Sequence, residues 1–270
     1  MSDSLRKRII TAAVLIALLL AVLFALPAAA TLGVLTLIVL LGAWEWSGFL
    51  KARNRLLRIG YVLAIGAALP LVWRLALQRA GLEWLLGAAA LWWLGALGWI
   101  VFAPQRVCAA AAALAGFGAL VPAWLALARL RLGGAHGAEW VLFCLLLVWM
   151  ADIGAYFAGR QFGRRRLAPR VSPGKTWEGV LGGAAACIPV AIAGGFWFSV
   201  PLGRFVVLCL AAVASSIVGD LTESLLKRFA GMKDSGTLFP GHGGVMDRID
   251  SLTGAAPVLL LGLTVMGVMS

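Results

Sequence analysis

Nine long apolar segments dominate the sequence and limit what it can fold into. They cover approximately residues 9–26, 31–50, 59–77, 84–103, 107–128, 140–158, 178–200, 205–225 and 252–269. A helix needs about 20 apolar residues to cross a bilayer, and each segment has roughly that length. Hydrophobic residues make up 62% of the 270-residue chain and charged residues 13%, outside the range of soluble proteins. The sequence therefore predicts an all-α, polytopic integral membrane protein with about nine transmembrane helices.

The basic residues predict how these helices are oriented. If the N-terminus is cytoplasmic, 18 of the 23 Lys and Arg residues fall in cytoplasmic loops and 5 in the opposite loops, as the positive-inside rule requires. We therefore expect a multi-pass protein of the inner, or plasma, membrane, with any active site in the polar loops facing the cytoplasm. The net charge of +12 is divided among short loops. This pattern argues against nucleic acid as a partner and favours membrane lipid headgroups and phosphates.

Ionisable residues divide the chain into two expected regions. Residues 1–135 have few charges at membrane depth and should form a scaffold of membrane helices, whereas residues 136–270 should form the catalytic membrane region with its motif loops. Glu45, between Trp44 and Trp46, is an exception within the scaffold. It would either belong to an interfacial aromatic anchor or make a polar contact to the site, because an intramembrane carboxylate usually has a partner.

Polar residues recur at helical spacing near the end of the eighth apolar segment. Those at i, i+3, i+4 and i+7 are Asp220, Glu223, Ser224 and Lys227. On a helix they share one face, which would be either an internal stripe of ion pairs or a site for a hard cation and phosphates. Asp247 and Asp250 stand three residues apart before the last segment. Carboxylates from two helix ends suit Mg²⁺, which takes one or two of them together with substrate phosphates.

Histidine and cysteine do not accompany these carboxylates closely enough to favour zinc. The cysteines stand singly in the expected spans, without CxxC spacing, and we interpret all four as small buried residues. They are Cys108, Cys144, Cys187 and Cys209.

Two further segments have compositions suited to anions. The turn Pro240–Gly244 contains three glycines, whose backbone N–H groups could approach an anion closely, although a merely flexible turn would look the same. His242 within it would contact a phosphate or base, or only cap the turn. The segment Ser172–Gly179 contains Gly-Lys-Thr but lacks the earlier glycine and preceding strand of a P-loop. What remains is a hydroxyl and lysine cluster at a helix N-terminus, which favours anions.

These motifs together resemble the phosphatidate cytidylyltransferase family, the CDP-diacylglycerol synthases. Ser224–Asp250 agrees with the hallmark pattern of that family at every fixed position, and Asp152–Tyr156 and Ser172–Gly179 resemble its two upstream motifs. The resemblance implies transfer of CMP from CTP to phosphatidic acid, giving CDP-diacylglycerol and pyrophosphate in phospholipid biosynthesis. It also implies Mg²⁺ and, in many members, a monovalent cation such as K⁺. A homodimer is compatible with family habit.

The resemblance also implies roles for individual residues. The expected catalytic residues are Asp220, Lys227, Asp247 and Asp250, and the expected metal ligands are Asp220, Glu223 and Asp247. The expected substrate or nucleotide contacts are Asp152, Ser172, Lys175, Thr176, Ser224, Arg228, Lys233, His242, Gly243, Gly244 and Arg248. Two other functions use similar features. A CTP-dependent polyprenol kinase would transfer the γ-phosphoryl group, and a cation transporter would place carboxylates in its spans.

Overall fold

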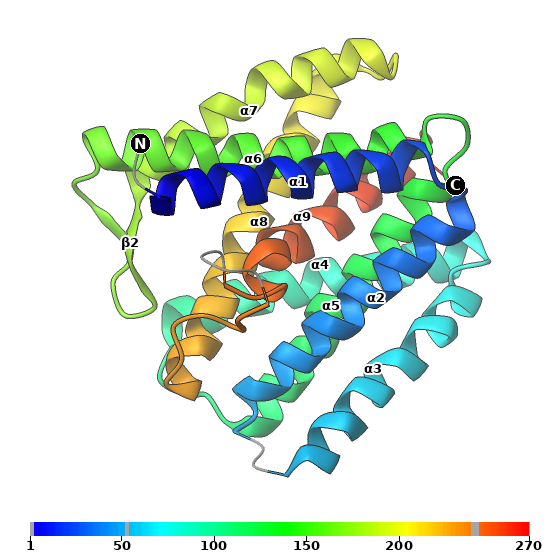
Figure 1. The fold of residues 1–270 in the computed structure, drawn as a ribbon. Helices are drawn as coiled ribbons and strands as arrows, with labels where there is room; N and C mark the ends of the chain where they lie inside the picture. Colours follow the sequence, from blue (N-terminus) through cyan, green and yellow to red (C-terminus); the bar gives the residue numbers. More distant parts are fainter. Residues whose placement is uncertain (1–2, 52–53, 239–242, 270) are drawn as a thin grey trace.

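The computed structural model describes residues 3–51, 54–238 and 243–269, with side chains from residue 13 onward. This part of the chain forms nine α-helices and one β-hairpin (Figure 1). The helices are α1 (Asp3–Phe24), α2 (Ala28–Phe49), α3 (Arg55–Leu75), α4 (Arg79–Phe102), α5 (Ala109–Leu132), α6 (Gly137–Phe162), α7 (Trp177–Trp197), α8 (Leu202–Ala230) and α9 (Met246–Val265). The strands are β1 (Arg166–Ala168) and β2 (Ser172–Thr176).

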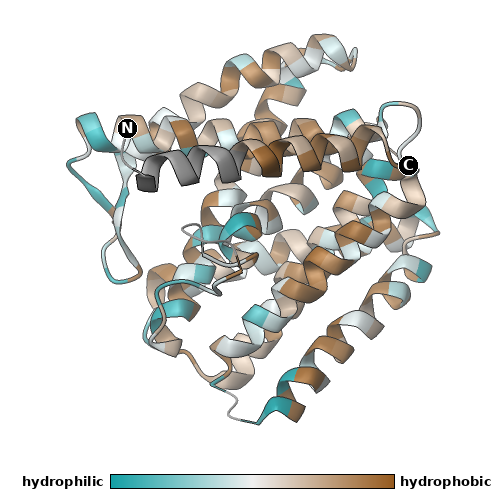
Figure 2. Cartoon of the chain, in the orientation of Figure 1, coloured by the Kyte–Doolittle hydropathy of each residue, from teal (hydrophilic) through white to brown (hydrophobic). Residues whose placement is uncertain are grey.

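Eight of these helices, α2 to α9, are long and apolar enough to cross a membrane, and the described side chains of α1 add the apolar stretch Ala13–Phe24. Figure 2 shows apolar residues along the helices, whereas hydrophilic residues gather in the hairpin and in the segment after α8. The prediction of an all-α, polytopic membrane protein is confirmed. The cytoplasmic position of the N-terminus and the division at residue 135 stay predictions.

Two helix boundaries differ from the predicted spans in a way that matters for the site. α8 continues to Ala230 and α9 begins at Met246, whereas the apolar segments suggested an end at residue 225 and a start at residue 252. Hydropathy marks only the stretch that lies in lipid, but a helix continues as long as its polar side chains find partners. The acidic residues therefore lie on regular helices rather than in flanking loops.

The helices pack most closely where small residues lie in the contact between them. α5 and α9 are the most enclosed of the spans and α3 the least. α6 and α7 approach so closely that a Cβ at Gly183 would lie 2.7 Å from the carbonyl oxygen of Ala151, and one at Gly179 would lie 3.0 Å from that of Ala155. Any larger side chain at either of these two glycines, which are four residues apart, would push the two backbones apart.

Two local features were not predicted. The first is the antiparallel β1–β2 hairpin between α6 and α7, in which Ala168 pairs with Ser172. The second is the environment of Cys108, which is exposed, whereas the other three cysteines are buried as expected. Cys108 precedes the first turn of α5, and its sulfur accepts a hydrogen bond from Ala111 N. The interpretation of all four cysteines as buried was therefore wrong for this one, because it caps a helix end.

Candidate active site

The polar face of α8 divides between two partners. Asp220 pairs with Lys175 of β2, with 2.5 Å between Oδ2 and Nζ, and its Oδ1 accepts a hydrogen bond of 3.2 Å from the Ser224 hydroxyl. One turn later, Lys227 Nζ lies 2.5 Å from Glu223 Oε2 and 2.7 Å from Asp247 Oδ1. The predicted face is therefore present, and its ion pairs form two lysine–carboxylate clusters, of which the Glu223–Lys227 pair is internal to α8.

A close crossing of α8 and α9 brings the acidic residues of the two helices together. A Cβ at Gly219 would lie 2.5 Å from the carbonyl oxygen of Asp250, and a Cβ at Gly254 would collide with the carbonyl oxygen of Ser215. Asp250 interacts electrostatically with Asp220 and Glu223 across this crossing. Its Oδ1 accepts a hydrogen bond from its neighbour Ser251 N, at 2.7 Å. The two glycines thus set how closely the carboxylates can approach one another.

Asp247, in the first turn of α9, accepts hydrogen bonds from four donors. Its Oδ1 accepts from Lys227 Nζ, and its Oδ2 accepts from Gly244 N at 2.8 Å and from the backbone N and hydroxyl of Ser235 at 2.9 Å each. The side chain is 9% exposed. This carboxylate therefore joins three chain segments: α8, the segment after α8 and the start of α9.

The glycine-rich turn is described from Gly243 onward, so His242 lies outside the described residues. Gly243 has a φ of +78°, and a Cβ there would lie 2.5 Å from Asp247 Oδ2. Only glycine suits both the conformation and this close approach. The amide of Gly244 donates to Asp247. The expected approach of backbone amides to an anion is therefore present, but the anion in this structure is a side chain of the same protein.

Glu223 is 1% exposed and is the least satisfied of these carboxylates. Its Oε2 contacts Lys227 Nζ, and Asp250 is a close acidic neighbour, but among the described residues neither oxygen has a donor in good hydrogen-bond geometry. Buried carboxylate oxygens normally have hydrogen-bond partners, so an exception calls for an explanation such as an absent ion. In the described part of the chain, no group of three or more His, Cys, Asp or Glu side chains is placed to hold a metal ion.

The hairpin contributes one side chain to the cluster and fixes the start of α7. Lys175 contacts Asp220, and Asp152 of α6 interacts electrostatically with both of them. Thr176 is buried and accepts a hydrogen bond of 3.1 Å from Gly179 N as the cap of α7. The expected hydroxyl at a helix N-terminus is confirmed for Thr176. Ser172 takes part in the hairpin pairing instead.

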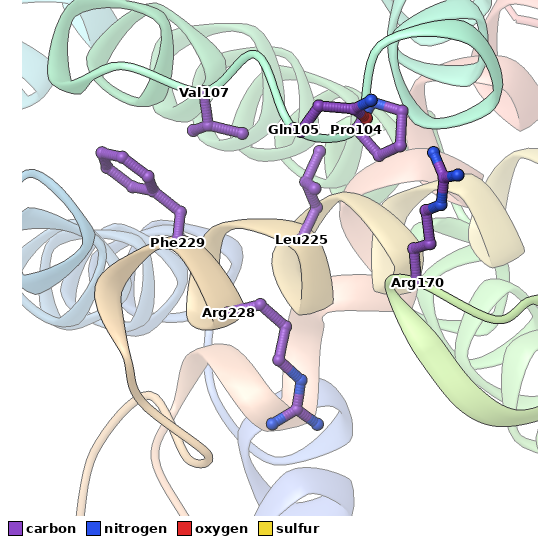
Figure 3. A pocket seen from close by; sticks show the side chains of 7 residues that line it. All are labelled: Pro104, Gln105, Val107, Arg170, Leu225, Arg228 and Phe229. Carbon is purple, nitrogen blue, oxygen red and sulfur yellow. The ribbon is translucent and has the colours of Figure 1, made fainter.

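Three of the predicted basic contacts are exposed. Lys233 is exposed after α8, and Arg248 is exposed on α9 and interacts electrostatically with Asp152. Arg228 is exposed and helps line a separate cavity of about 490 Å³ between α8 and the α4–α5 connection. Figure 3 shows Leu225 and Phe229 pointing towards this connection, with Arg228 extending away from them. The structure thus separates Arg228 from its neighbour on α8, the lysine paired with Glu223 and Asp247.

The structure also brings in two residues from outside the expected set. Glu45 of α2 is buried and reaches the start of α9, and Ser235 contacts both Glu45 and Asp247. For Glu45, the polar-contact alternative is therefore the correct one. A carboxylate in an otherwise apolar helix was the available signal. Ser235 had no comparable signal, because a serine in a polar loop is ordinary.

Comparison with known proteins supplies the family. A model described as the cytidylyltransferase family matches residues 6–266. Phosphatidate cytidylyltransferase of Haemophilus influenzae is 39% identical over 278 residues, covering 94% of this chain and 96% of the relative. That of Pseudomonas aeruginosa is 42% identical over 262 residues, with 94% and 95% covered. That of Brucella suis is 39% identical over 224 residues, with 81% and 71% covered. With a match over nearly its whole length, the chain belongs to the cytidylyltransferase family.

Proposed function

We propose that the residues gathered where β2, α8 and α9 meet carry out the transfer of CMP from CTP to phosphatidic acid. The activity follows from the relatives, which match nearly the full length at about 40% identity: the chain is a phosphatidate cytidylyltransferase. The observation that supports this location for the reaction is the pair of lysine–carboxylate clusters on α8. Ionisable side chains in membrane helices cost free energy, so those that are present usually serve a function.

The two lysines provide the positive charge that the substrates need. CTP and phosphatidic acid are both anions, and their reacting groups must approach each other. Lys175 and Lys227 now neutralise Asp220 and the pair Glu223 and Asp247. We propose that both ammonium groups turn towards phosphate oxygens when CTP binds and stabilise the charge that develops on the leaving pyrophosphate. Ser224, hydrogen-bonded to Asp220, is close enough to join the first lysine in this contact.

The carboxylates fit a divalent cation that is completed by substrate. Mg²⁺ typically takes one or two protein carboxylates together with phosphates and water. Glu223 has an oxygen without a hydrogen-bond partner, each oxygen of Asp220 has only one partner, and Asp247 offers only Oδ1 for a further contact. We propose that one or two of these three carboxylates would hold each Mg²⁺, with substrate phosphates and water completing its ligands and Asp250 nearby. A bound Mg²⁺ would neutralise phosphate charge and favour in-line displacement at the α-phosphorus. We assign no residue to K⁺.

The nucleophile needs little help from a base. The phosphate monoester of phosphatidic acid is largely ionised near neutral pH, because the second pKa of such groups is about 6. The chain's task is therefore to bring two anions together and to orient them. Asp152 and Arg248 lie beside Lys175 and Asp220 and would border the nucleotide. The ends of α8 and α9 also suit a lipid substrate, because its acyl chains can stay in the bilayer while CTP enters from the water.

The direct test follows the two ends of the CTP triphosphate separately. Purified protein in detergent would receive phosphatidic acid, Mg²⁺ and CTP labelled at either the α- or the γ-phosphorus. We expect α-label in the lipid fraction and γ-label in pyrophosphate. Transfer of γ-label to lipid would identify a lipid kinase instead. No transfer of either label, beside an active control enzyme, would favour a cation transporter, for which the carboxylates would be an ion pathway.

A further inference from the structure

Glu45 is a buried carboxylate in the half of the chain that is otherwise apolar. It is 9% exposed and lies between two tryptophans that serve as anchors. Trp46 donates a hydrogen bond of 2.8 Å to Ala112 O, and the Arg58 guanidinium lies 4.2 Å from the ring centre of Trp44. The tryptophans therefore make their contacts within the protein, and Trp46 is buried in the core. The carboxylate between them needs a separate explanation, because burying a charge is costly unless it is well hydrogen-bonded.

Three donors from the distant end of the chain surround this carboxylate. Oε1 accepts from Val245 N at 2.9 Å, and Oε2 accepts from Met246 N at 2.8 Å and from the Ser235 hydroxyl at 2.9 Å. Gly236 and Gly244 pack against it so tightly that a Cβ on either would collide with the carboxyl group. Glu45 is thus enclosed by the polar segment that joins α8 to α9.

The same contacts make Glu45 the cap of α9. The first turn of a helix has backbone N–H groups without partners inside the helix. Val245, the residue before α9, offers no side-chain hydrogen bond of its own. The amides of Val245 and Met246 donate to Glu45 instead, and a negative charge at a helix N-terminus is also favoured by the helix dipole. A side chain from α2 therefore determines where α9 starts.

The capped amide of Met246 is one residue from Asp247, which belongs to the proposed reaction centre. Met246 is followed by Asp247, which holds Lys227, and the Ser235 hydroxyl lies 2.9 Å from both Glu45 Oε2 and Asp247 Oδ2. We infer that Glu45 is a positioning residue that sets the location of Asp247, and through it Lys227, for cytidylyl transfer. The inference rests on the proposed function of that pair, and it gives the scaffold half of the chain a direct part in the site.

Glu45→Gln is the sharpest variant, because it keeps the shape of the side chain. Glutamine has one acceptor oxygen where glutamate has two. Its NH₂ group would therefore face the N–H of either Val245 or Met246, which would place two hydrogen-bond donors against each other. We expect kcat to fall about 10- to 100-fold, as small misplacements at a reaction centre do, with little change in KM for CTP. The Mg²⁺ concentration for half-maximal activity should rise several-fold. Glu45→Asp, which keeps the charge but is shorter, should recover part of the loss.

Glu83→Gln is the matched control, because Glu83 is an exposed carboxylate of α4 that pairs only with Arg79. It should leave every parameter unchanged. A loss of folded protein would lower the rate without altering the Mg²⁺ requirement. Suppose that the wild-type enzyme transfers α-label and that Glu45→Gln has the same kcat and the same Mg²⁺ requirement. This result would overturn the positioning role of Glu45 and leave the proposed function unaffected.

Hydrogen–deuterium exchange tests the contact without relying on activity. Amides of the peptide containing residues 243–250 should exchange faster in Glu45→Gln than in the wild type or Glu83→Gln, because Val245 N and Met246 N lose their acceptor. Unchanged exchange would overturn the inference even if the rate fell. Ser235→Ala should have a smaller effect, and the double variant with Glu45→Gln should be no worse than Glu45→Gln alone, because both act through one segment.

Discussion

Two sets of carboxylates lie at the same end of this molecule and differ in how completely they are satisfied. Glu45 accepts from two backbone amides and Asp247 from two backbone amides and Lys227, and the two carboxylates share the single O–H of Ser235. On the polar face of α8, Asp220 has one lysine and one hydroxyl, and Glu223 has Lys227 as an ionic partner but no partner in hydrogen-bond geometry among the described residues. The difference suggests two kinds of work for one residue type. The first set mainly holds the chain in place, with only Oδ1 of Asp247 left for a ligand, and the second keeps more of its oxygen atoms available.

The two sets should also respond differently to mutation. Removing a well-satisfied carboxylate leaves buried donors without acceptors, which costs about 1–3 kcal/mol of stability per stranded group. Removing an under-satisfied carboxylate relieves repulsion from its neighbours and costs little stability. Under-satisfied carboxylates are needed for activity but lower the stability of the protein, which is common at functional sites. The predictions below use this contrast.

The largest loss of activity is expected for Asp220→Asn. Asparagine keeps the shape of the side chain but removes the charge that we assign to cation binding, so transfer of α-label should fall by about three orders of magnitude or more. Thermal unfolding should change little, because Asp220 pairs with Lys175, which is partly exposed and can reach water. Activity near the wild-type level at ordinary Mg²⁺ would remove Asp220 from the proposed ligands.

Asp247→Asn is expected to reduce activity about 10²- to 10³-fold and to lower the unfolding temperature as well. The introduced NH₂ group would face either Lys227 or the donors from Ser235 and Gly244, so at least one buried donor would lose its acceptor. Comparing unfolding temperatures in the same detergent measures the contrast directly. If Asp220→Asn destabilised the protein as much as Asp247→Asn, the division into two sets of carboxylates would be wrong.

The sequence predicted much of this site because its signals are local. Apolar length located the membrane helices, and the spacing of Asp220, Glu223 and Lys227 placed them on one helix face. The choice of partner could not be read in this way. Glu45 lies 200 residues from Val245, and only the packing of α2 beside α9 brings them together. Whether a carboxylate is satisfied depends on such distant donors, so the two sets look alike in the sequence.

Gly219→Ala tests how the α8–α9 crossing holds the two sets in register. The new Cβ would lie 2.5 Å from the carbonyl oxygen of Asp250, so the helices must separate. Overpacking of this kind usually costs about 1–3 kcal/mol, and we expect activity to fall about 10- to 100-fold because the carboxylates on the two helices move apart. Gly203→Ala is the control on the same helix, because a Cβ at Gly203 meets nothing within 4 Å. Equal losses in both variants would show that helix flexibility matters rather than the crossing.

The smallest effect is expected for Arg228→Gln, compared with Lys227→Gln at the adjacent position. The lysine is held between Glu223 and Asp247, with its side chain 14% exposed, so its loss would leave two buried carboxylates facing each other. Arg228 instead lies on the cavity side of α8 and is exposed. Lys227→Gln should therefore abolish most activity, whereas Arg228→Gln should change kcat about threefold or less, measured as transfer of α-label. If the arginine variant lost as much activity as the lysine variant, CTP phosphates would have to reach both faces of α8. The reaction centre would then include the cavity. Residues on both sides of α8, and not only those on its polar face, would bind substrate.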